Sequence, residues 1–357
     1  MSGADGPPSP KGIQMSTNFY SHSAKVSRRR FLQTSALSAI AGSSLTSWGE
    51  ASVPQAGIAS SNAAFLNGAI EAARWIRSAE RESSQGNYWL PEPDHPEKAV
   101  TVSPINGIYS GSAGVVLFFL QLAKATGDAS YLVDARRGAD FLLSTWHDAP
   151  AKELLPGTNL SFYTGRAGVA FVLAEAWKAT GETKYRDAAV AATQSIAAQA
   201  RPSGNGVAWS ASPGIIADGG VVLYLLYAAD AFDQEEYRAL AARAGDHFVE
   251  LAAPQTSGGI SWKGAPAAVL GLPEETYFPN FELGTAGVAF VLARLYEATD
   301  NSRFLDAARQ GALHLQKIAT VRGRGALIPY RYPDLTDVTS LTLWSGIIIA
   351  GRAIAYF

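Results

Sequence analysis

A short glycine-marked segment recurs four times along the chain. In three copies two glycines enclose two residues and an apolar run follows, at 111–120, 165–173 and 284–292, and a weaker copy lies at 217–225. Seventeen positions after the second glycine of each copy stands an aromatic residue, namely Tyr131, Tyr185, Tyr237 and Phe304. The second glycines are 54, 52 and 67 residues apart. One frame repeated at roughly this period indicates a repeat protein rather than a single irregular core.

Each copy predicts a pair of helices. The segment after the glycines is apolar on nearly every face, which is typical of a buried helix, and the next segment has an apolar stripe opposite polar residues, which is typical of a covering helix. We expect buried helices at 107–126, 162–180, 214–232 and 281–299. We expect covering helices at 130–146, 184–200, 235–252 and 302–318. A first covering helix is expected from a cap near Ser60 to about Ala79, and a fifth buried helix at 341–357.

Paired helices of this kind stack so that each pair covers its neighbour's apolar face, in an open superhelix or in a closed ring. The buried helices need partners on both sides and behind, which favours the ring. The expected fold class is therefore all-α, an α/α toroid of repeated helical hairpins, with residues 56–357 as one domain.

The amino-terminal residues 1–55 read as a leader. Ser27-Arg28-Arg29-Arg30-Phe31-Leu32-Gln33 resembles a twin-arginine export signal, and a mildly apolar run of small residues follows from Thr34 to Leu45. A basic, disordered tail is the alternative. The signal predicts an exported protein, periplasmic or extracellular, cleaved between about Ser47 and Ala59; the run is too short and too polar for a membrane span.

Charge and cysteine content exclude several classes of function. The chain of 357 residues has a net charge of −2 and no run of basic residues after the leader, which argues against nucleic-acid binding. It has no cysteine, which excludes disulfides, thiolate nucleophiles and sulfur-ligated metals. We expect no metal and no cofactor.

The connections between covering and buried helices share a Gly-x-x-Trp motif. It places Trp89, Trp209 and Trp262 at the end of the ring where the buried helices begin, which we call the mouth. Exposed tryptophans there would be stacking platforms for a sugar ring or a peptide side chain. The alternative is that they plug the loops onto the ring.

The glycine pairs lie at the starts of the buried helices. They either let neighbouring backbones approach closely or leave amides free for an anion. The residue two before the second glycine varies in polar character, as Ser112, Arg166, Asp218 and Thr285, and the residue five before it is Tyr109, Tyr163, Ile215 or Glu282. Varied tips on a constant frame are what a binding site on a repeat scaffold would show, although solvated helix ends would look the same. Candidate binding residues are therefore Tyr109, Tyr163 and Arg166 with the three tryptophans.

Asp218 and Glu282 are candidate catalytic carboxylates, and His95 is a candidate ligand or general acid because it is the histidine expected at the mouth. Two carboxylates facing each other across the mouth would support glycoside hydrolysis. His147, His247 and His314 lie on or near covering helices and are expected to be outer-face or packing residues.

The repeated Gly-x-x-Gly-Val with its apolar run, together with Thr126-Gly127-Asp128 and Tyr131-Leu132, resembles the lanthionine synthetase C-like family over about residues 60–350. The resemblance implies a ring of seven hairpins and, for the cyclases of that family, a zinc held by two cysteines and one histidine that activates a substrate thiol. Trp344-Ser345-Gly346 has serine where the family has cysteine, and no Cys-His-Gly occurs. Thioether cyclisation is therefore not expected. About five buried helices can be counted, so an incomplete ring, or a ring completed by a second copy, is a further expectation.

Three functions remain open from the sequence. The first is an exported relative of this family, without zinc, that binds or modifies a peptide or small molecule at the mouth. The second is a carbohydrate-active toroid, hydrolase or lyase, that uses Asp218 and Glu282. The third is a non-catalytic scaffold.

Overall fold

The computed structural model describes residues 55–96, 106–148, 158–264, 273–322 and 325–333. The chain divides into two compact units, Met1–Ala72 and Ala73–Phe357, and the repeats belong to the second. No helix in the described ranges is both long enough and apolar enough to cross a membrane.

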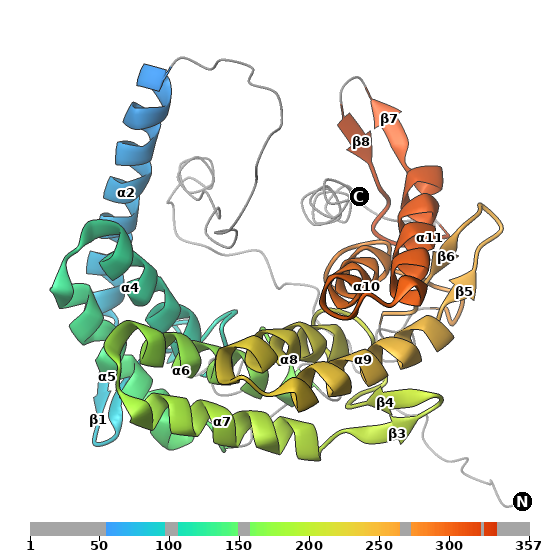
Figure 1. Cartoon of the computed structure of the whole chain (residues 1–357). Helices are drawn as coiled ribbons and strands as arrows, with labels where there is room; N and C mark the ends of the chain where they lie inside the picture. Colours follow the sequence, from blue (N-terminus) through green and yellow to red (C-terminus); the bar gives the residue numbers. More distant parts are fainter. Residues whose placement is uncertain (1–54, 97–105, 149–157, 265–272, 323–324, 334–357) are drawn as a thin grey trace, which may run out of the picture. The chain divides into compact units, whose positions relative to one another are not determined.

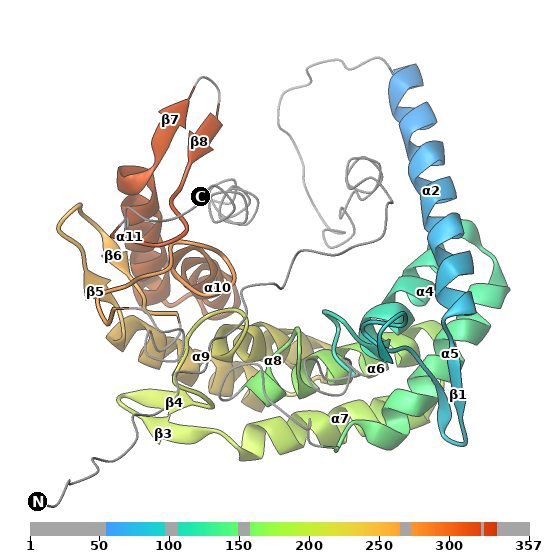
Figure 2. The same cartoon turned by 180° about the vertical axis from the view of Figure 1, so that it is seen from behind.

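Four inner helices follow the glycine segments, and each pairs with the outer helix that follows it (Figure 1). The inner helices are α4 (Ser112–Thr126), α6 (Arg166–Thr180), α8 (Asp218–Phe232) and α10 (Thr285–Thr299). The outer helices are α2 (Gln55–Ser78), α5 (Ala129–Thr145), α7 (Thr183–Ala198), α9 (Glu235–Glu250) and α11 (Ser302–Ile318). Each inner helix packs against the next in chain order, α4 on α6, α6 on α8 and α8 on α10, as both views show (Figure 2). The predicted all-α fold of repeated hairpins, with the inner and outer layers of an α/α toroid, is confirmed for this unit.

The turn between inner and outer helix begins at the same repeat position in all four hairpins, with a residue in the left-handed conformation. Gly127 and Gly181 end α4 and α6 in the left-handed region at φ 70° and 75°, and Asp233 and Asp300 take the same conformation after α8 and α10. Glycine has no Cβ that this conformation would crowd, so it ends a helix readily.

Short β-hairpins follow the outer helices α2, α7, α9 and α11, where the sequence predicts only loops. The strand pairs are β1 (Arg81–Ser83) with β2 (Gly86–Tyr88), β3 (Arg201–Ser203) with β4 (Gly206–Ala208), β5 (Ala253–Pro254) with β6 (Ile260–Ser261), and β7 (Thr320–Arg322) with β8 (Gly325–Leu327).

Helix starts are the main correction to the predicted elements. Every inner helix begins four or five residues later than expected, because the apolar residues before it form a turn rather than a first helical turn. The first outer helix begins at Gln55, so Ser60 lies inside it and is not its cap. The expected fifth inner helix at 341–357 and the leader 1–54 lie outside the described residues.

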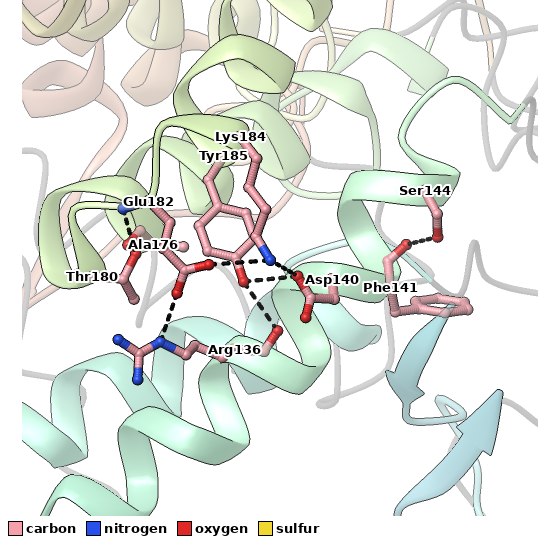
Figure 3. Close-up of polar contacts among 9 residues, drawn as sticks. All are labelled: Arg136, Asp140, Phe141, Ser144, Ala176, Thr180, Glu182, Lys184 and Tyr185. Atoms are coloured by element: carbon pink, nitrogen blue, oxygen red, sulfur yellow. Dashed lines mark hydrogen bonds and ion pairs between the residues drawn. The ribbon is translucent and has the colours of Figure 1, made fainter. Parts of the chain in front are cut away.

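Outer helices are held to each other by polar contacts, most extensively between α5 and α7. Asp140 accepts hydrogen bonds from Lys184 Nζ at 2.7 Å and from the Tyr185 hydroxyl at 2.9 Å, while Glu182 accepts one from Arg136 Nε at 2.8 Å (Figure 3). Lys184 has a raised pKa, chiefly because of its hydrogen bond to Asp140. The network fixes two neighbouring repeats in register at the outer surface.

Candidate functional site

The turns that precede the inner helices lie side by side and form the mouth. The Tyr109 amide donates to the Tyr163 carbonyl oxygen at 2.9 Å, and the Ile216 amide donates to the Glu282 carbonyl oxygen at 3.1 Å. The second and third turns are also adjacent, because a Cβ added to Gly220 would lie 3.1 Å from the Cβ of Phe162. All four repeats therefore bring their turns to one place.

The second glycine of each repeat is a packing device. A Cβ added to it would come within 2.0 to 2.4 Å of a carbonyl oxygen in the turn before its own helix, at Gly114, Gly168, Gly220 and Gly287. No real side chain tolerates that approach, so the turn folds over the helix only if the residue is glycine. This geometry explains the glycines without an anion.

The side chain five residues before the second glycine is exposed in three of the four repeats. Tyr109 is 72% exposed and Tyr163 37% exposed, and Glu282 is exposed as well. The corresponding residue of the third repeat, Ile215, is buried at 1%. The position five before the second glycine is thus the one at which the mouth presents aromatic and acidic groups.

Protein surrounds these exposed groups closely enough to change their chemistry. Desolvation raises the pKa of the Glu282 carboxyl above its ordinary value. Desolvation, and then the charge of Glu282, raises the pKa of the Tyr163 hydroxyl. Both side chains therefore reach water on one side while neighbouring protein shields them on the other.

Asp218 does not face the mouth. Its side chain is 2% exposed, and its Oδ2 accepts hydrogen bonds from the Trp209 amide at 3.0 Å and the Ser210 amide at 3.2 Å. Burial raises the pKa of this carboxyl. The expectation that Asp218 and Glu282 form an exposed catalytic pair is wrong, because Asp218 is used to hold the backbone of the preceding hairpin.

The three tryptophans are plugs rather than stacking platforms, which corrects the other expectation. Trp89, Trp209 and Trp262 are 4%, 9% and 0% exposed, so no ring face is open to a ligand. Each indole donates to a carbonyl at the end of the preceding outer helix, with oxygen distances of 2.9 Å to Ile76, 2.8 Å to Ile196 and 2.7 Å to Phe248.

The polar residue two before the second glycine completes this plug. The backbone amide of Trp89 donates to Ser112 Oγ at 3.1 Å, and that of Trp262 donates to Thr285 Oγ1 at 3.5 Å, as Trp209 does to Asp218. On the other side, a Cβ at Gly138 or Gly311 would lie 2.9 Å from the ring of Trp89 or Trp262. Sequence reasoning missed this device, although a Gly-x-x-Trp paired with a hydroxyl or carboxyl at a fixed repeat position was the signal for it.

Arg166 is turned toward the outer layer. Its Nη1 donates to Ser195 Oγ at 2.9 Å, its guanidinium lies 5.7 Å from the centre of the Trp146 ring, and burial lowers its pKa. His95 is exposed in the loop after β2, where its amide donates to the Glu92 carbonyl at 3.0 Å. A catalytic role for His95 stays a prediction.

The histidines of the outer helices have the packing role expected of them. His247 Nε2 lies 3.2 Å from Ser203 Oγ, and His314 Nδ1 lies 3.1 Å from Ser257 Oγ.

The residues present do not fit the zinc site that the family resemblance implies. The chain has no cysteine, and no group of three or more histidine, aspartate or glutamate side chains converges in the described part of the chain. The serine of Trp344-Ser345-Gly346 lies outside the described residues. Hydroxyl groups are poor zinc ligands, so we derive no step through a metal.

Several solved structures of low sequence identity are similar to this chain. A GH76 α-mannanase of Bacteroides thetaiotaomicron matches with 14% identity and a TM-score of 0.49, over 84% of this chain and 82% of that one. An α-1,6-mannanase of Salegentibacter sp. in complex with α-1,6-mannotriose matches with 14% identity and a TM-score of 0.47, over 72% and 71%. A D-mannose isomerase matches with 15% identity and a TM-score of 0.48, over 74% and 73%. With every TM-score below 0.5, these similarities carry no argument about the site.

No curated protein sequence matches the chain. A family model does match, from the turn before α4 to the end of β6. The resemblance seen in the sequence is thereby confirmed for this region: residues 105–262 match the model of the lanthionine synthetase C-like protein family.

Proposed function

We propose that the protein binds a peptide or a small molecule at its mouth, through Tyr109, Tyr163 and Glu282. One observation carries the proposal: at one equivalent position of the mouth turns, two phenol rings and a carboxyl are exposed, whereas Ile215 at that position of the third repeat is buried. The family match of residues 105–262 supports a mouth site, and the absence of cysteine argues for a function without the zinc chemistry.

The chemistry of the three side chains defines the ligand. An exposed phenol offers an apolar face and a hydroxyl, which suits a sugar ring or an amino-acid side chain. A carboxyl with a raised pKa keeps its proton to a higher pH, so Glu282 donates a hydrogen bond under conditions in which an ordinary glutamate only accepts. The ligand we expect therefore combines a flat apolar surface with a hydrogen-bond acceptor.

Carbohydrate hydrolysis is the less well supported alternative. It requires two carboxyl groups that face one substrate, and Asp218 is buried against backbone amides. Mannotriose is included in the test as a probe of this alternative, which the sequence left open.

The proposal is tested by calorimetric titration of the full chain with α-1,6-mannotriose and with acidic, basic and apolar short peptides. We expect one class to bind, with affinity reduced at least about ten-fold in Tyr109→Ala, since removing a contact worth about 1.4 kcal/mol has that effect. Glu282→Gln should weaken binding and remove its pH dependence. Val133→Ala, on the outer helix α5 and 44% exposed, is the matched control. Binding that all three variants leave unchanged would place the site elsewhere, and no binding by any probe would favour the scaffold hypothesis.

We also propose that the chain is exported through the twin-arginine pathway, on the strength of Ser27-Arg28-Arg29-Arg30-Phe31-Leu32. If Arg28 and Arg29 are replaced by lysine, the protein should stay in the cytoplasmic fraction. The unchanged chain should be found outside that fraction. Equal distribution of both proteins between the fractions would contradict the proposal.

A further inference from the structure

One interface recurs three times inside the chain: each hairpin packs on the next outer helix. A glycine at the start of the second strand, or directly before it, approaches the helix backbone closely. An added Cβ there would lie 2.5 Å from the Phe141 amide nitrogen, 2.9 Å from that of His247 and 2.6 Å from that of His314. The glycines are Gly86, Gly206 and Gly259. The hairpins thus seat on α5, α9 and α11 at one equivalent helix position.

The side chain at that helix position, which we call the anchor residue, also contacts the hairpin. Phe141 stacks on Tyr88 with ring centres 4.9 Å apart. His247 and His314 are paired with Ser203 and Ser257, as described above. The side chains differ, but each anchor residue is covered by the hairpin that precedes it in the chain.

The outer helix α2 has the same position, and its anchor residue is Trp75. In α9 the anchor residue His247 comes directly before Phe248, whose carbonyl oxygen accepts the indole hydrogen bond of Trp262. In α2 the corresponding acceptor is the carbonyl oxygen of Ile76, which binds the indole of Trp89. The residue directly before Ile76 is Trp75. Trp75 belongs to the second unit of the chain and is 59% exposed. Among the tryptophans in the described ranges, Trp75 is the one whose side chain is exposed.

The surface around Trp75 is hollowed. A cavity of about 350 Å³ is lined by Trp75, Ser78, Arg81, Pro93 and Asp94. Such a cavity is at the lower end of the size of ligand sites and accepts a few side chains. An exposed indole beside a hollow is a typical interaction surface.

The hairpin of β7 and β8 resembles the hairpins that cover the other anchor residues. Its last strand pair joins Arg322 to Gly325. The first and second hairpins end in the same way, with Ser83 paired to Gly86 and Ser203 paired to Gly206. Val321 in β7 is 75% exposed. No outer helix covers this hairpin within the described residues.

We propose that the hairpin of β7 and β8 packs on the Trp75 surface of a second copy of this chain. The proposed contact reproduces the interface that the chain already makes three times, between a hairpin with a closing glycine and an outer helix with an anchor residue. A second copy covers Trp75 and Val321 without rearranging either surface, both of which are exposed in the single chain. The interface is heterologous, so it produces rings or open chains of copies rather than a twofold dimer. The proposal does not depend on the ligand of the mouth.

The absence of cysteine makes the contact testable by directed disulfide formation in the full chain. Two differently tagged single variants, Ser78→Cys and Val321→Cys, are mixed and oxidised. We expect a disulfide-linked pair that contains both tags. The matched control, Leu251→Cys mixed with Val321→Cys, should give no such pair, because Leu251 is exposed at the end of α9 and does not belong to the Trp75 surface. Light scattering should show assemblies that grow with concentration and dissociate in Trp75→Ala.

Two results would overturn the inference. The first is a monomer at every concentration together with no mixed disulfide. The second is a Ser78→Cys, Val321→Cys double variant that forms its disulfide within one chain at high dilution, because the hairpin would then close its own ring. Circular dichroism of each variant shows that the fold is kept, and the mannotriose and peptide titrations of the mouth are read separately.

Discussion

The second and third repeats use the same sequence position in opposite ways. Asp218, two before the second glycine of the third repeat, is buried and binds the backbone amides of the preceding hairpin. Arg166 at the same position of the second repeat is half-buried and reaches Ser195 on the outer helix α7. The variation at this position therefore reflects how each repeat is held together. The ligand site that we propose uses instead the position three residues earlier, where Tyr109, Tyr163 and Glu282 are exposed.

The largest loss of stability is expected when one of the three buried loop tryptophans is removed. Trp262→Ala removes a fully buried ring and its hydrogen bond to Phe248, and should lower the free energy of unfolding by about 3–5 kcal/mol. Denaturant titration measures this. Tyr109→Ala removes an exposed ring and should change stability by less than about 0.5 kcal/mol. Similar losses in both variants would mean that Trp262 is not a plug.

Asp218→Ala is expected to come next. It leaves the buried amides of Trp209 and Ser210 without their acceptor, at a cost of about 1–3 kcal/mol for each unsatisfied group. Asp218→Asn keeps an acceptor oxygen and should cost clearly less, again by denaturant titration. If the two variants were equally unstable, the hydrogen bonds would not be the reason for the buried carboxyl.

The pH dependence of stability provides a sharper test of Asp218. Burial raises its pKa in the folded protein above the ordinary value of 3.8, so the folded state holds this proton more tightly than the unfolded state does. The stability that comes from the protonated form is fully present below pH 3.8 and is lost as the pH rises through the raised pKa. Relative to Asp218→Asn, which does not titrate, the original protein should lose stability across that range. Parallel curves for the two proteins would contradict a raised pKa.

A smaller effect than that of Asp218→Ala is expected at Arg166. Its hydrogen bond to Ser195 and its contact with Trp146 are partly exposed, so Arg166→Ala should cost about 0.5–1.5 kcal/mol. A double-mutant cycle with Ser195→Ala measures the coupling, which we expect to be near 0.5 kcal/mol or more. An additive double variant, or a loss as large as that of Asp218→Ala, would remove the contrast between the two repeats.

Much of the fold could be predicted because the same pattern of apolar and polar residues recurs in each repeat. Tyr131, Tyr185, Tyr237 and Phe304 fall at one helical position, and periodicity separates inner from outer helices. The helix starts were placed early because Phe162, Ile215 and Phe281 continue the apolar pattern through a turn. The hairpins were missed because strands of two or three residues are too short to show an alternating pattern.

The candidate site was predicted only in part. Tyr109, Tyr163 and Glu282 are where the sequence placed them, at the mouth, but Asp218 and the three tryptophans are structural. A polar residue at the start of a helix and a tryptophan in a loop have the same sequence signature whether they face a ligand or the core.

The sequence by itself determined the repeat, the order and type of the helices, and the exclusion of thiol and disulfide chemistry, because these follow from composition and from spacing along the chain. Only the tertiary structure decided which polar and aromatic groups are open to a ligand. Burial depends on what packs against a side chain from other repeats. Trp262 is buried between α9 and α11 and Trp75 is exposed on α2, although both are tryptophans of the same repeated scaffold.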